Sequence, residues 1–282
     1  MIILCADDYA LTQGISRAIG ELAAARRLSA TSAIVTGPHW PAMAQRLLVH
    51  RSHLALGLHL NLTLGAPLGP MPRLAAQGQF AGFGALARAA VGGLRIGEIR
   101  GEIDRQLDRF EQHLGSSPDH IDGHQHVHAF PLIRRALLEA VVYRYPRSPP
   151  LIRNPADHLR AILARRLAVP KAVVVALLAS GFARAARERG LPTNDGFAGF
   201  SAFDPAGDYG EELARALKVP GRRHIIMCHP GHPDAELSGL DPVVERRRME
   251  YTVLMRDPLL PQRIWRPERA ASGPSLVWSQ LG

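Results

Sequence analysis

The 282-residue chain has little of what marks secreted or membrane-spanning proteins. Its two cysteines, Cys5 and Cys228, both lie in apolar runs, which argues against a disulfide framework and predicts buried thiols. The amino terminus has no basic segment and reaches two acids by residue 8, so it does not resemble a signal peptide. An apolar stretch at 172–179 lies between Lys171 and Arg184, which bracket only 12 residues and leave it too short to span a bilayer. We therefore expect a cytoplasmic protein.

Aromatic residues are also scarce, at 6% of the chain. The net charge of +9 favours anionic partners. However, the basic residues are scattered and are not interleaved with aromatics, which argues against a nucleic-acid-binding module. The sequence contains no internal repeat and no low-complexity linker. Because barrels of alternating strands and helices reach this size as one unit, we expect a single domain over residues 1–282, with a helical insertion at about 157–190.

Histidine, in contrast, is concentrated in one stretch, residues 118–130, which reads P-D-H-I-D-G-H-Q-H-V-H-A-F. Four of the chain's 13 histidines fall within nine residues here. Alternating side chains of a long strand would place several of these polar groups on one face, which no packed interior tolerates without partners. We expect a strand that ends near Asp122, with the remaining histidines in the loop beyond Gly123. Imidazole is the commonest metal-binding side chain, so this stretch favours a divalent metal over a solvated histidine-rich loop.

The rest of the chain alternates segments typical of strands and of helices. The strands are expected at 2–6, 29–36, 54–62, 149–154 and 222–227, with 275–281 closing the sheet, and helical spacing separates several of them. Chemically active side chains lie at the carboxyl ends of these strands: Asp7 and Asp8 at the first, His59 at the third, the His124 cluster at the histidine-rich strand, and Arg153 and His229 at later ones. This pattern predicts a distorted, TIM-like (β/α) barrel whose active site lies at the carboxyl ends of its strands.

One carboxylate and two imidazoles leave open positions on a divalent ion, as catalytic zinc sites do. A second carboxylate can take a proton from water and a histidine can protonate a leaving group, a set suited to hydrolysis of an amide or ester. Each residue also has a structural alternative: paired aspartates cap helices, and a single histidine is often a core residue. Five such groups at one rim favour the site.

Four motifs resemble the YdjC-like carbohydrate deacetylases, a group that includes chitooligosaccharide and hopanoid-biosynthesis deacetylases. These motifs are A-D-D-Y at 6–9, G-L-H-L-N-L-T at 57–63, H-I-D-G-H-Q-H-V-H at 120–128 and M-C-H-P-G at 227–231. The resemblance covers nearly the whole chain and implies a distorted (β/α) barrel with one divalent ion. It also implies hydrolytic removal of acetyl from an N-acetylated sugar. Two positions depart from the family pattern: Cys5 replaces a common Asn and Ala10 a common Gly.

The resemblance also implies roles for individual residues. Asp8, His59 and His124 would bind the metal, which the sequence leaves open as zinc or magnesium. Asp7 would be the general base, and His229 the general acid.

Further residues are assigned around this set. We expect Arg153 to hold Asp7 ionised, and we group it with Asn61 and Asp195 as residues that bind substrate. His126 and His128 are expected in supporting positions, and His128 is an alternative ligand because it forms an H-x-x-x-H pair with His124.

The alternatives to a deacetylase are a metal-dependent phosphoesterase, which commonly uses two metals, and the nucleic-acid-binding module argued against above. The substrate is expected to be a soluble or a lipid-linked N-acetylated sugar. For the lipid-linked case, an amphipathic basic helix at 159–168 would lie on the inner face of the membrane. The alternative is a helix packed on the barrel with its arginines in solvent. A homodimer is left open.

Overall fold

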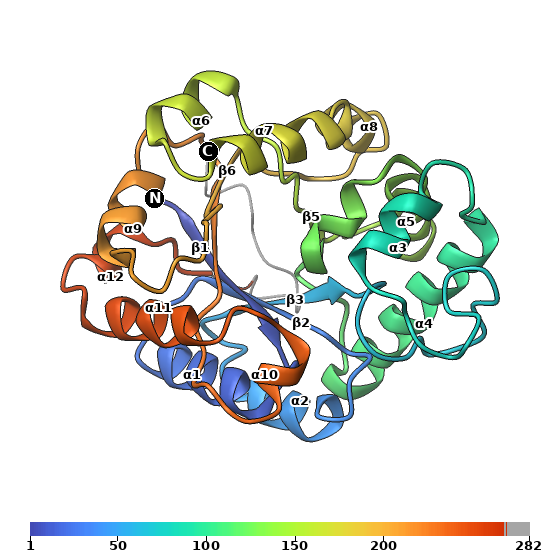
Figure 1. Cartoon of the computed structure of the whole chain (residues 1–282), viewed down its shortest axis with the longest axis horizontal. Coiled ribbons are helices and arrows are strands. Elements are labelled where there is room, and N and C mark those ends of the chain that lie inside the picture. Colours follow the sequence, from blue (N-terminus) through green and yellow to red (C-terminus); the bar gives the residue numbers. More distant parts are fainter. Residues whose placement is uncertain (268, 270–282) are drawn as a thin grey trace.

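A sheet of seven parallel strands forms the centre of the protein in the computed structural model, which describes residues 1–267 and 269. The strand order is β5-β4-β3-β2-β1-β7-β6. The strands are β1 (Ile3–Tyr9), β2 (Ala30–Ala33), β3 (Ala55–Leu60), β4 (His120–Gly123), β5 (Leu151–Ile152), β6 (Gly196–Ala198) and β7 (His224–Cys228). The sheet curls and helices surround it on its outer side (Figure 1). The predicted distorted (β/α) barrel is confirmed.

The helices follow the strands in the alternation that the sequence predicts. They are α1 (Gln13–Ala24), α2 (Trp40–Leu48), α3 (Phe83–Ala89), α4 (Ile96–Leu114), the 3₁₀ helix η1 (His124–Ala129), α5 (Pro131–Arg144), α6 (Leu159–Arg165), α7 (Val169–Leu178), α8 (Phe182–Arg187), α9 (Tyr209–Ala216), α10 (Leu237–Leu240), α11 (Glu245–Arg256) and α12 (Leu260–Arg263). As expected, α4 ends at Gly115, which adopts a left-handed conformation with φ of 67°. The strand β6 was not predicted, and the predicted strand at 275–281 lies outside the described residues.

The two sides of the barrel are joined between β5 and β6 by one backbone bridge and by side chains, chiefly that of Asn194; Asp157 also accepts from the N–H of Phe197 at 3.2 Å. Ile152 forms an isolated parallel bridge with Thr193, which precedes β6. The amide of Asn194 then replaces further backbone pairing: its Oδ1 accepts from the Asn154 N–H at 2.7 Å, and its Nδ2 donates to the Asn154 carbonyl at 2.8 Å. Asn194 also donates to the carbonyl of Gly196 at 3.0 Å, which links β5 to the start of β6. A side chain therefore joins the two edges of the sheet.

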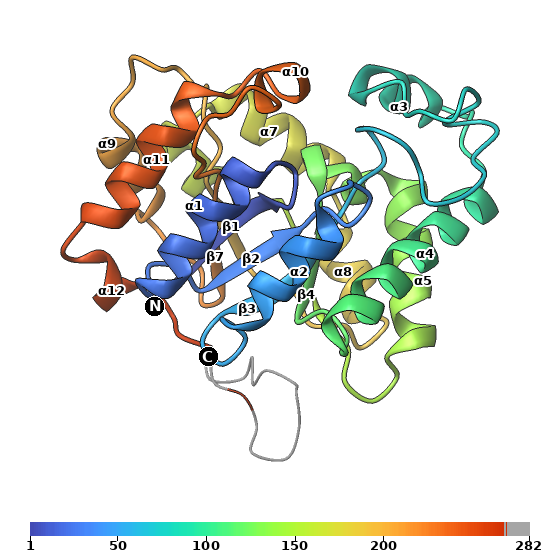
Figure 2. The same cartoon turned by 90° about the horizontal axis from the view of Figure 1, so that it is seen from below.

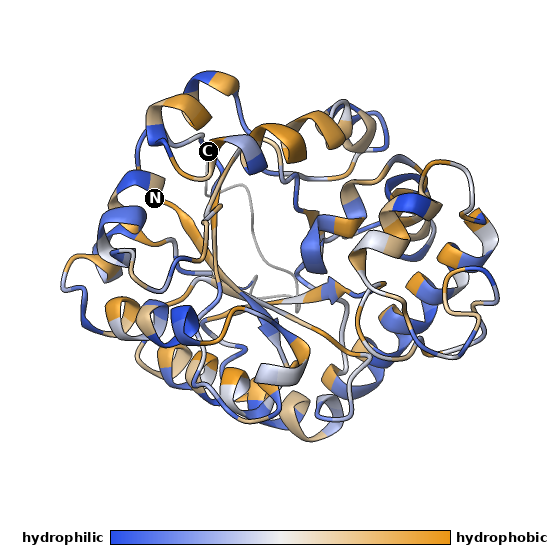
Figure 3. Ribbon diagram, viewed as in Figure 1, coloured by the Kyte–Doolittle hydropathy of each residue, from blue (hydrophilic) through white to orange (hydrophobic). Residues whose placement is uncertain are grey.

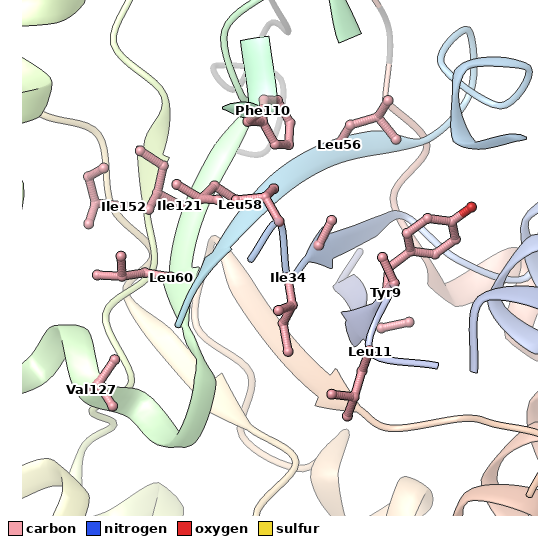
Figure 4. Packing of buried hydrophobic residues seen from close by; sticks show 14 of the residues in the cluster. Tyr9, Leu11, Ile34, Leu56, Leu58, Leu60, Phe110, Ile121, Val127 and Ile152 are labelled. Carbon is pink, nitrogen blue, oxygen red and sulfur yellow. The ribbon is translucent and has the colours of Figure 1, made fainter. Parts of the chain in front are cut away.

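The strands separate an apolar outer face from a small inner one, and β3 illustrates the division. Leu56, Leu58 and Leu60 point outward into the apolar cluster that also contains Phe110 of α4 (Figure 4). Their alternating neighbours Ala55, Gly57 and His59 face the interior, as the period of two predicted. Gly57 leaves room there for the imidazole of His120, because a Cβ on Gly57 would lie 2.3 Å from His120 Nε2. The narrow interior is apolar at the amino ends of the strands and becomes polar toward their carboxyl ends.

The segment between β5 and β6 folds into the three short helices α6, α7 and α8. The chain breaks at Arg166–Ala168, where Arg166 and Ala168 have positive φ, and Pro170 lies in the first turn of α7. Within the described residues, the 19-residue stretch Val169–Arg187 has a mean hydropathy of 1.5 and is long and apolar enough to cross a membrane by length and composition alone. That differs from the expectation of a stretch too short to span. In the fold, Gly181, with φ of 74°, separates α7 from α8, so neither helix extends over the whole stretch.

Candidate active site

The end of β1 brings two consecutive aspartates to the same side of the sheet. Successive residues of a regular strand point to opposite faces. Here the pairing of β1 with β2 is irregular between Ala6 and Tyr9, and Asp8 adopts a positive φ of 67°. Such a bulge redirects side chains, so Asp7 and Asp8 both approach His59. Ala10 also has φ of 67°, a conformation that glycine adopts without strain, so the family's usual Gly at this position has a physical reason.

Asp8, His59 and His124 converge from three strand ends. Oδ1 of Asp8 lies 3.3 Å from Nε2 of His59 and 3.0 Å from Nδ1 of His124. The three ligand atoms lie within 4.8 Å of one another, and all three side chains are buried. One carboxylate with two imidazoles is the donor set of a catalytic metal site that retains open positions.

His59 is oriented from behind by Asp122 on the neighbouring strand. The two residues are directly paired between β3 and β4, and His59 Nδ1 donates to Asp122 Oδ1 at 2.6 Å. An ionised carboxylate can only accept, so Nδ1 carries a proton and Nε2 is the nitrogen that faces Asp8 and His124. Burial disfavours the charged imidazole, but the carboxylates of Asp122 and Asp7 outweigh it and raise the pKa of His59 to about 10. A carboxylate behind a histidine is typical of metal-binding histidines.

Asp8 is held from its other side by Arg247 of α11. Arg247 Nη2 donates to Asp8 Oδ2 at 2.6 Å and to Asp241 Oδ2 at 2.9 Å, and the guanidinium is buried. Burial would raise the pKa of Asp8, but Arg247 and His124 hold it well below its usual range. Because Arg247 contacts only Oδ2, Oδ1 stays directed toward the two histidines. Arg247 therefore fixes which oxygen of Asp8 faces the site.

Arg153, which directly follows β5, lies fully buried beneath the site. Its Nη1 donates to Asp7 Oδ2 and its Nη2 to Asp7 Oδ1, each at 2.7 Å, and it forms an ion pair with Asp122. Nη2 also lies 3.0 Å from Sγ of Cys5, so the residue that departs from the family pattern contacts this guanidinium. Assigning Arg153 to substrate binding is wrong, because none of its surface is exposed. It holds Asp7 in place, the other function expected of it.

Three clusters in the barrel have donor atoms close enough for a metal ion, but they differ in their cationic neighbours. In the Asp7–His59–Asp122 cluster, Arg153 pairs with both carboxylates and occupies both oxygens of Asp7. In the Cys5–His120–Asp122 cluster, Arg153 contacts the thiol and Asp122. At either place the guanidinium of Arg153 contacts two of the three donor side chains, whereas Arg247 contacts only Oδ2 of Asp8 and leaves Oδ1 and both imidazoles available. Of the clusters in the described residues, the one with Asp8, His59 and His124 fits a divalent ion best.

His229 follows β7 and lies next to this cluster, half-buried. Its backbone N–H donates to Glu250 Oε2 of α11 at 2.6 Å, and its ring packs edge-on against Phe203 at 5.3 Å between centroids. Burial lowers the pKa of His229 to about 4, although the nearby charges of Asp8 and Asp7 act in the opposite direction. The ring is therefore neutral at neutral pH.

Two residues expected to bind substrate do not reach the site. Asn61 is buried in the turn after β3, where its Oδ1 accepts from the N–H groups of Thr63 and Leu64 and its Nδ2 donates to Thr36 Oγ1. The amide is thus fully occupied in holding the turn. Asp195 precedes β6 and accepts from the N–H of Arg223, just before β7. It therefore lies at the amino ends of these strands, away from the carboxyl ends that carry the site.

His126 and His128 lie in η1 and belong to none of the three clusters. His126 is buried, with its ring 5.8 Å from that of Phe197 and 5.4 Å from that of Phe200. His128 Nε2 donates to the carbonyl of Arg153 at 2.9 Å, and burial lowers the pKa of His128 to about 4. The alternative ligand role of His128 is therefore not supported by its position. Its contact with Arg153 places it in a supporting layer.

Sequence reasoning did not assign Asp122 or Arg247 to the site. The sequence did contain a signal for Asp122, because this residue lies two positions before His124 in the histidine-rich stretch. In the fold it pairs with His59 across β3 and β4. The sequence contained no signal for Arg247, which is the middle residue of an arginine triplet and lies 239 residues from Asp8 along the chain.

Replacing Arg153 by Met should lower the free energy of unfolding by about 3–5 kcal/mol, because it leaves buried carboxylates without their cation. Arg153 lowers the pKa of Asp122, so the stability it contributes is present above the unfolded pKa near 4 and is lost as pH falls below it. The difference between the two proteins should therefore be largest at neutral pH and shrink in acid. Urea unfolding across this pH range measures it.

Arg135→Met is the matched control, because the side chain of Arg135 is 66% exposed and pairs with Glu139 on the surface. It should change the free energy of unfolding little at any pH. An Arg153→Met protein as stable as the parent at pH 7 would show that the buried pair is not required.

Comparison with known proteins agrees with this geometry. A family model described as YdjC-like protein matches residues 1–262. A carbohydrate deacetylase of Mus musculus is 31% identical over 255 residues, which cover 84% of this chain and 80% of that protein. A chitooligosaccharide deacetylase of Serratia marcescens is 31% identical over 249 residues, which cover 84% of each.

A solved structure from Enterococcus faecalis has the same fold, with a TM-score of 0.70 at 21% identity over 91% of this chain and 90% of that chain. The family model spans every strand of the barrel and the residues that converge at its rim. The chain therefore belongs to the YdjC-like protein family.

Proposed function

We propose that this protein is a metal-dependent hydrolase that removes acetyl from an N-acetylated sugar. One observation carries the proposal. Asp8, His59 and His124 bring one oxygen and two nitrogens together, and a second carboxylate, Asp7, lies beside them and is bound by Arg153. Relatives named carbohydrate deacetylase and chitooligosaccharide deacetylase support the choice of reaction and of substrate class.

Asp8, His59 and His124 would hold a divalent ion, zinc or magnesium. When bound, such an ion would polarise the acyl carbonyl and lower the pKa of an adjacent water. The chain's own residues prepare for it: Asp122 binds Nδ1 of His59 and so leaves Nε2 as the nitrogen that faces the site, and Arg247 turns Oδ1 of Asp8 toward the histidines. Orientation by outer partners of this kind typically governs affinity for metal.

Asp7 would accept the proton of the attacking water. Arg153 binds both of its oxygens, but a carboxylate has about four lone-pair positions, so acceptor capacity remains. Arg153 also fixes the carboxylate against rotation, and Ser32 Oγ adds a contact at 3.3 Å. A base held in one orientation satisfies the geometric requirement of general base catalysis.

His229 would carry a proton to the departing amine. Because its pKa is about 4, it is neutral in the resting protein and must gain its proton during the reaction. The water that Asp7 deprotonates is the source, so the proton passes from water to amine while the acetyl group leaves as acetate. Glu250, through its bond to the His229 N–H, fixes the backbone that carries the ring.

The proposal also concerns where the protein is located in the cell and whether it forms a dimer. Both cysteines are buried free thiols, which suits a reducing compartment such as the cytoplasm. A homodimer is neither required nor opposed by the site, which one chain supplies entirely.

The purified protein should contain about one divalent ion per chain, as expected for three protein ligands around an open site. Replacing His59 or His124 by Ala should remove metal and activity together. Elemental analysis of dialysed protein measures the metal. His126→Ala is the matched control, since His126 is a buried histidine of the same stretch that belongs to no cluster. Full metal content in a His59→Ala/His124→Ala protein would place the metal elsewhere.

Substitutions of Asp7 and Asp8 should have different effects on metal binding and turnover. Asp7→Asn should leave metal bound but lower turnover by roughly a hundred- to ten-thousandfold, as loss of a general base does. Asp8→Asn should mainly weaken metal binding. Metal content and turnover are measured on the same preparations. If Asp7→Asn lost metal while Asp8→Asn retained it, the two roles would be reversed.

Acetate release from a panel of substrates tests the reaction itself. The panel contains chitooligosaccharides, a lipid-linked N-acetylglucosamine, an O-acetylated sugar and a phosphate monoester. Release of acetate from the N-acetylated sugars is expected, in equal amount with the free amine. Release of phosphate without acetate would instead identify a phosphoesterase and overturn the proposal.

A further inference from the structure

Two neighbouring helices, α6 and α7, expose apolar side chains that have no cover in the described part of the chain. Leu159 and Leu163 on α6 are 59% and 52% exposed, and Val174 and Leu177 on α7 are 63% and 71% exposed. They recur at spacings of four and three residues, so each pair lies on one side of its helix. The hydropathy colouring shows α7 as a largely apolar helix at the edge of the molecule (Figure 3). Together these four residues form what we term the α6–α7 face.

The same segment carries much of the protein's positive charge. Residues 157–190 contain seven arginines and lysines against two acids, a net charge of +5 out of +9 for the whole chain. Arg165 is not part of the exposed charge: it is buried, pairs with Asp157 and donates to backbone carbonyls, which corrects the expectation that the arginines of α6 lie in solvent. Arg160 and Arg166 are exposed, as is Lys171 at the start of α7. The α6–α7 face is therefore apolar with a basic surround.

This face adjoins the active-site end of the barrel. The ammonium group of Lys171 lies 4.7 Å from the ring centre of Phe203, and Phe203 packs against His229. Seen from the side, α7 lies with α3 and α10 at one end of the molecule, and the amino terminus lies at the other (Figure 2). The α6–α7 segment thus contacts the same end of the barrel as His229.

We propose that the α6–α7 face docks on an anionic lipid bilayer. Exposed Leu and Val insert favourably at the boundary of headgroups and acyl chains, and basic residues around them are attracted to anionic lipid. A nucleic acid would match the charge but would leave the apolar side chains without partners. A second copy of the chain would match the apolar side chains but would bring two segments of +5 together, which is unfavourable.

The geometry suits a helix that lies on the membrane and does not cross it. The 10 residues of α7 extend about 15 Å, half of the ~30 Å hydrocarbon core. Buried positions alternate with exposed ones along the helix: Ala172 and Val175 pack against the barrel interior, while Val174 and Leu177 face outward. Only the outer side of α7 is available to lipid.

Resting on the proposed function, this docking would present the site to an N-acetylated sugar carried by a membrane lipid. A soluble substrate must diffuse to the site in three dimensions, whereas a lipid-linked one is delivered along the surface to which the α6–α7 face is bound. The same site would serve either substrate. Whether the protein is bound to a membrane would therefore decide which substrate reaches it.

Co-sedimentation with vesicles at physiological salt tests the docking. The wild-type protein should sediment with vesicles of phosphatidylcholine and phosphatidylglycerol and stay in solution with phosphatidylcholine alone. Leu163→Gln/Leu177→Gln should lower the partition coefficient by at least about tenfold, because it removes the inserted apolar groups. Arg160→Gln/Arg166→Asn should also lower it by roughly tenfold or more, since each basic residue near an anionic surface contributes on the order of fivefold. Asn is chosen at Arg166 because it tolerates the positive φ there.

Two matched controls carry the same changes elsewhere on the surface. Val49→Gln/Val91→Gln replaces two apolar residues that are 71% and 90% exposed, and Arg17→Gln/Arg135→Gln removes two exposed arginines. Both should bind vesicles like the wild type. Absence of wild-type binding to anionic vesicles, or equal losses in face and control variants, would overturn the proposal. So would a dimer, seen by light scattering, that dissociates on Leu163→Gln/Leu177→Gln, because a second copy would then cover the face.

Acetate release from soluble chitooligosaccharides, measured on every variant, separates this inference from the proposed function. The face variants should retain it, because they do not contact the site. Vesicle binding without acetate release from any substrate would reject the deacetylase and leave the docking intact. Acetate release without vesicle binding would reject the docking alone.

Discussion

A guanidinium buried at the centre of the barrel is the constraint on which the site depends. Arg153 has no exposed surface and binds Asp7 through two hydrogen bonds and Asp122 through an ion pair. Burying any one of these charges alone would be prohibitively unfavourable, so the three are present together or not at all. Asp122 in turn sets the proton position of His59, and Asp7 is fixed beside the histidines. A single cation thus fixes the proton acceptor and one nitrogen of the proposed metal site.

The charges of this interior also explain why a further cation fits. Asp7, Asp8 and Asp122 are three buried carboxylates, and Arg153 and Arg247 are two buried guanidiniums. Asp122 and Asp7 raise the pKa of His59 to about 10, so the imidazole carries a proton when no other cation is near. A metal ion on Nε2 would replace that proton, which is the usual exchange when a histidine becomes a ligand. Protonation of His59 and metal binding are therefore alternatives for one position.

The sequence predicted those parts of the site that depend on strand ends, and missed those that depend on distant contacts. Asp8, His59 and His124 converge because parallel strands deliver their carboxyl ends to one rim. The strand pattern indicated that rim, and the family resemblance selected these three residues from it. Asn61 was misassigned because alternation was extended beyond Leu60, where β3 ends and a turn begins. Asp195 was misplaced because β6 has three residues, too few to show a period, so the residue before the strand was taken for a loop at the other end. Arg247 approaches Asp8 from α11, and no local pattern distinguishes it from the arginines on either side.

The join between β5 and β6 has a consequence for motion. Neighbouring strands of the sheet share two to four register partners, whereas β5 meets the β6 side through one backbone bridge and the side chains of Asn194 and Asp157. Regions with few backbone hydrogen bonds open at the lowest free energy, so amide hydrogens should exchange fastest along this join. Arg153 directly follows β5, and α6–α8 connect the two sides. Opening of the barrel here would withdraw the guanidinium from both aspartates at once, so the ionic balance of the interior lasts only while the barrel is closed.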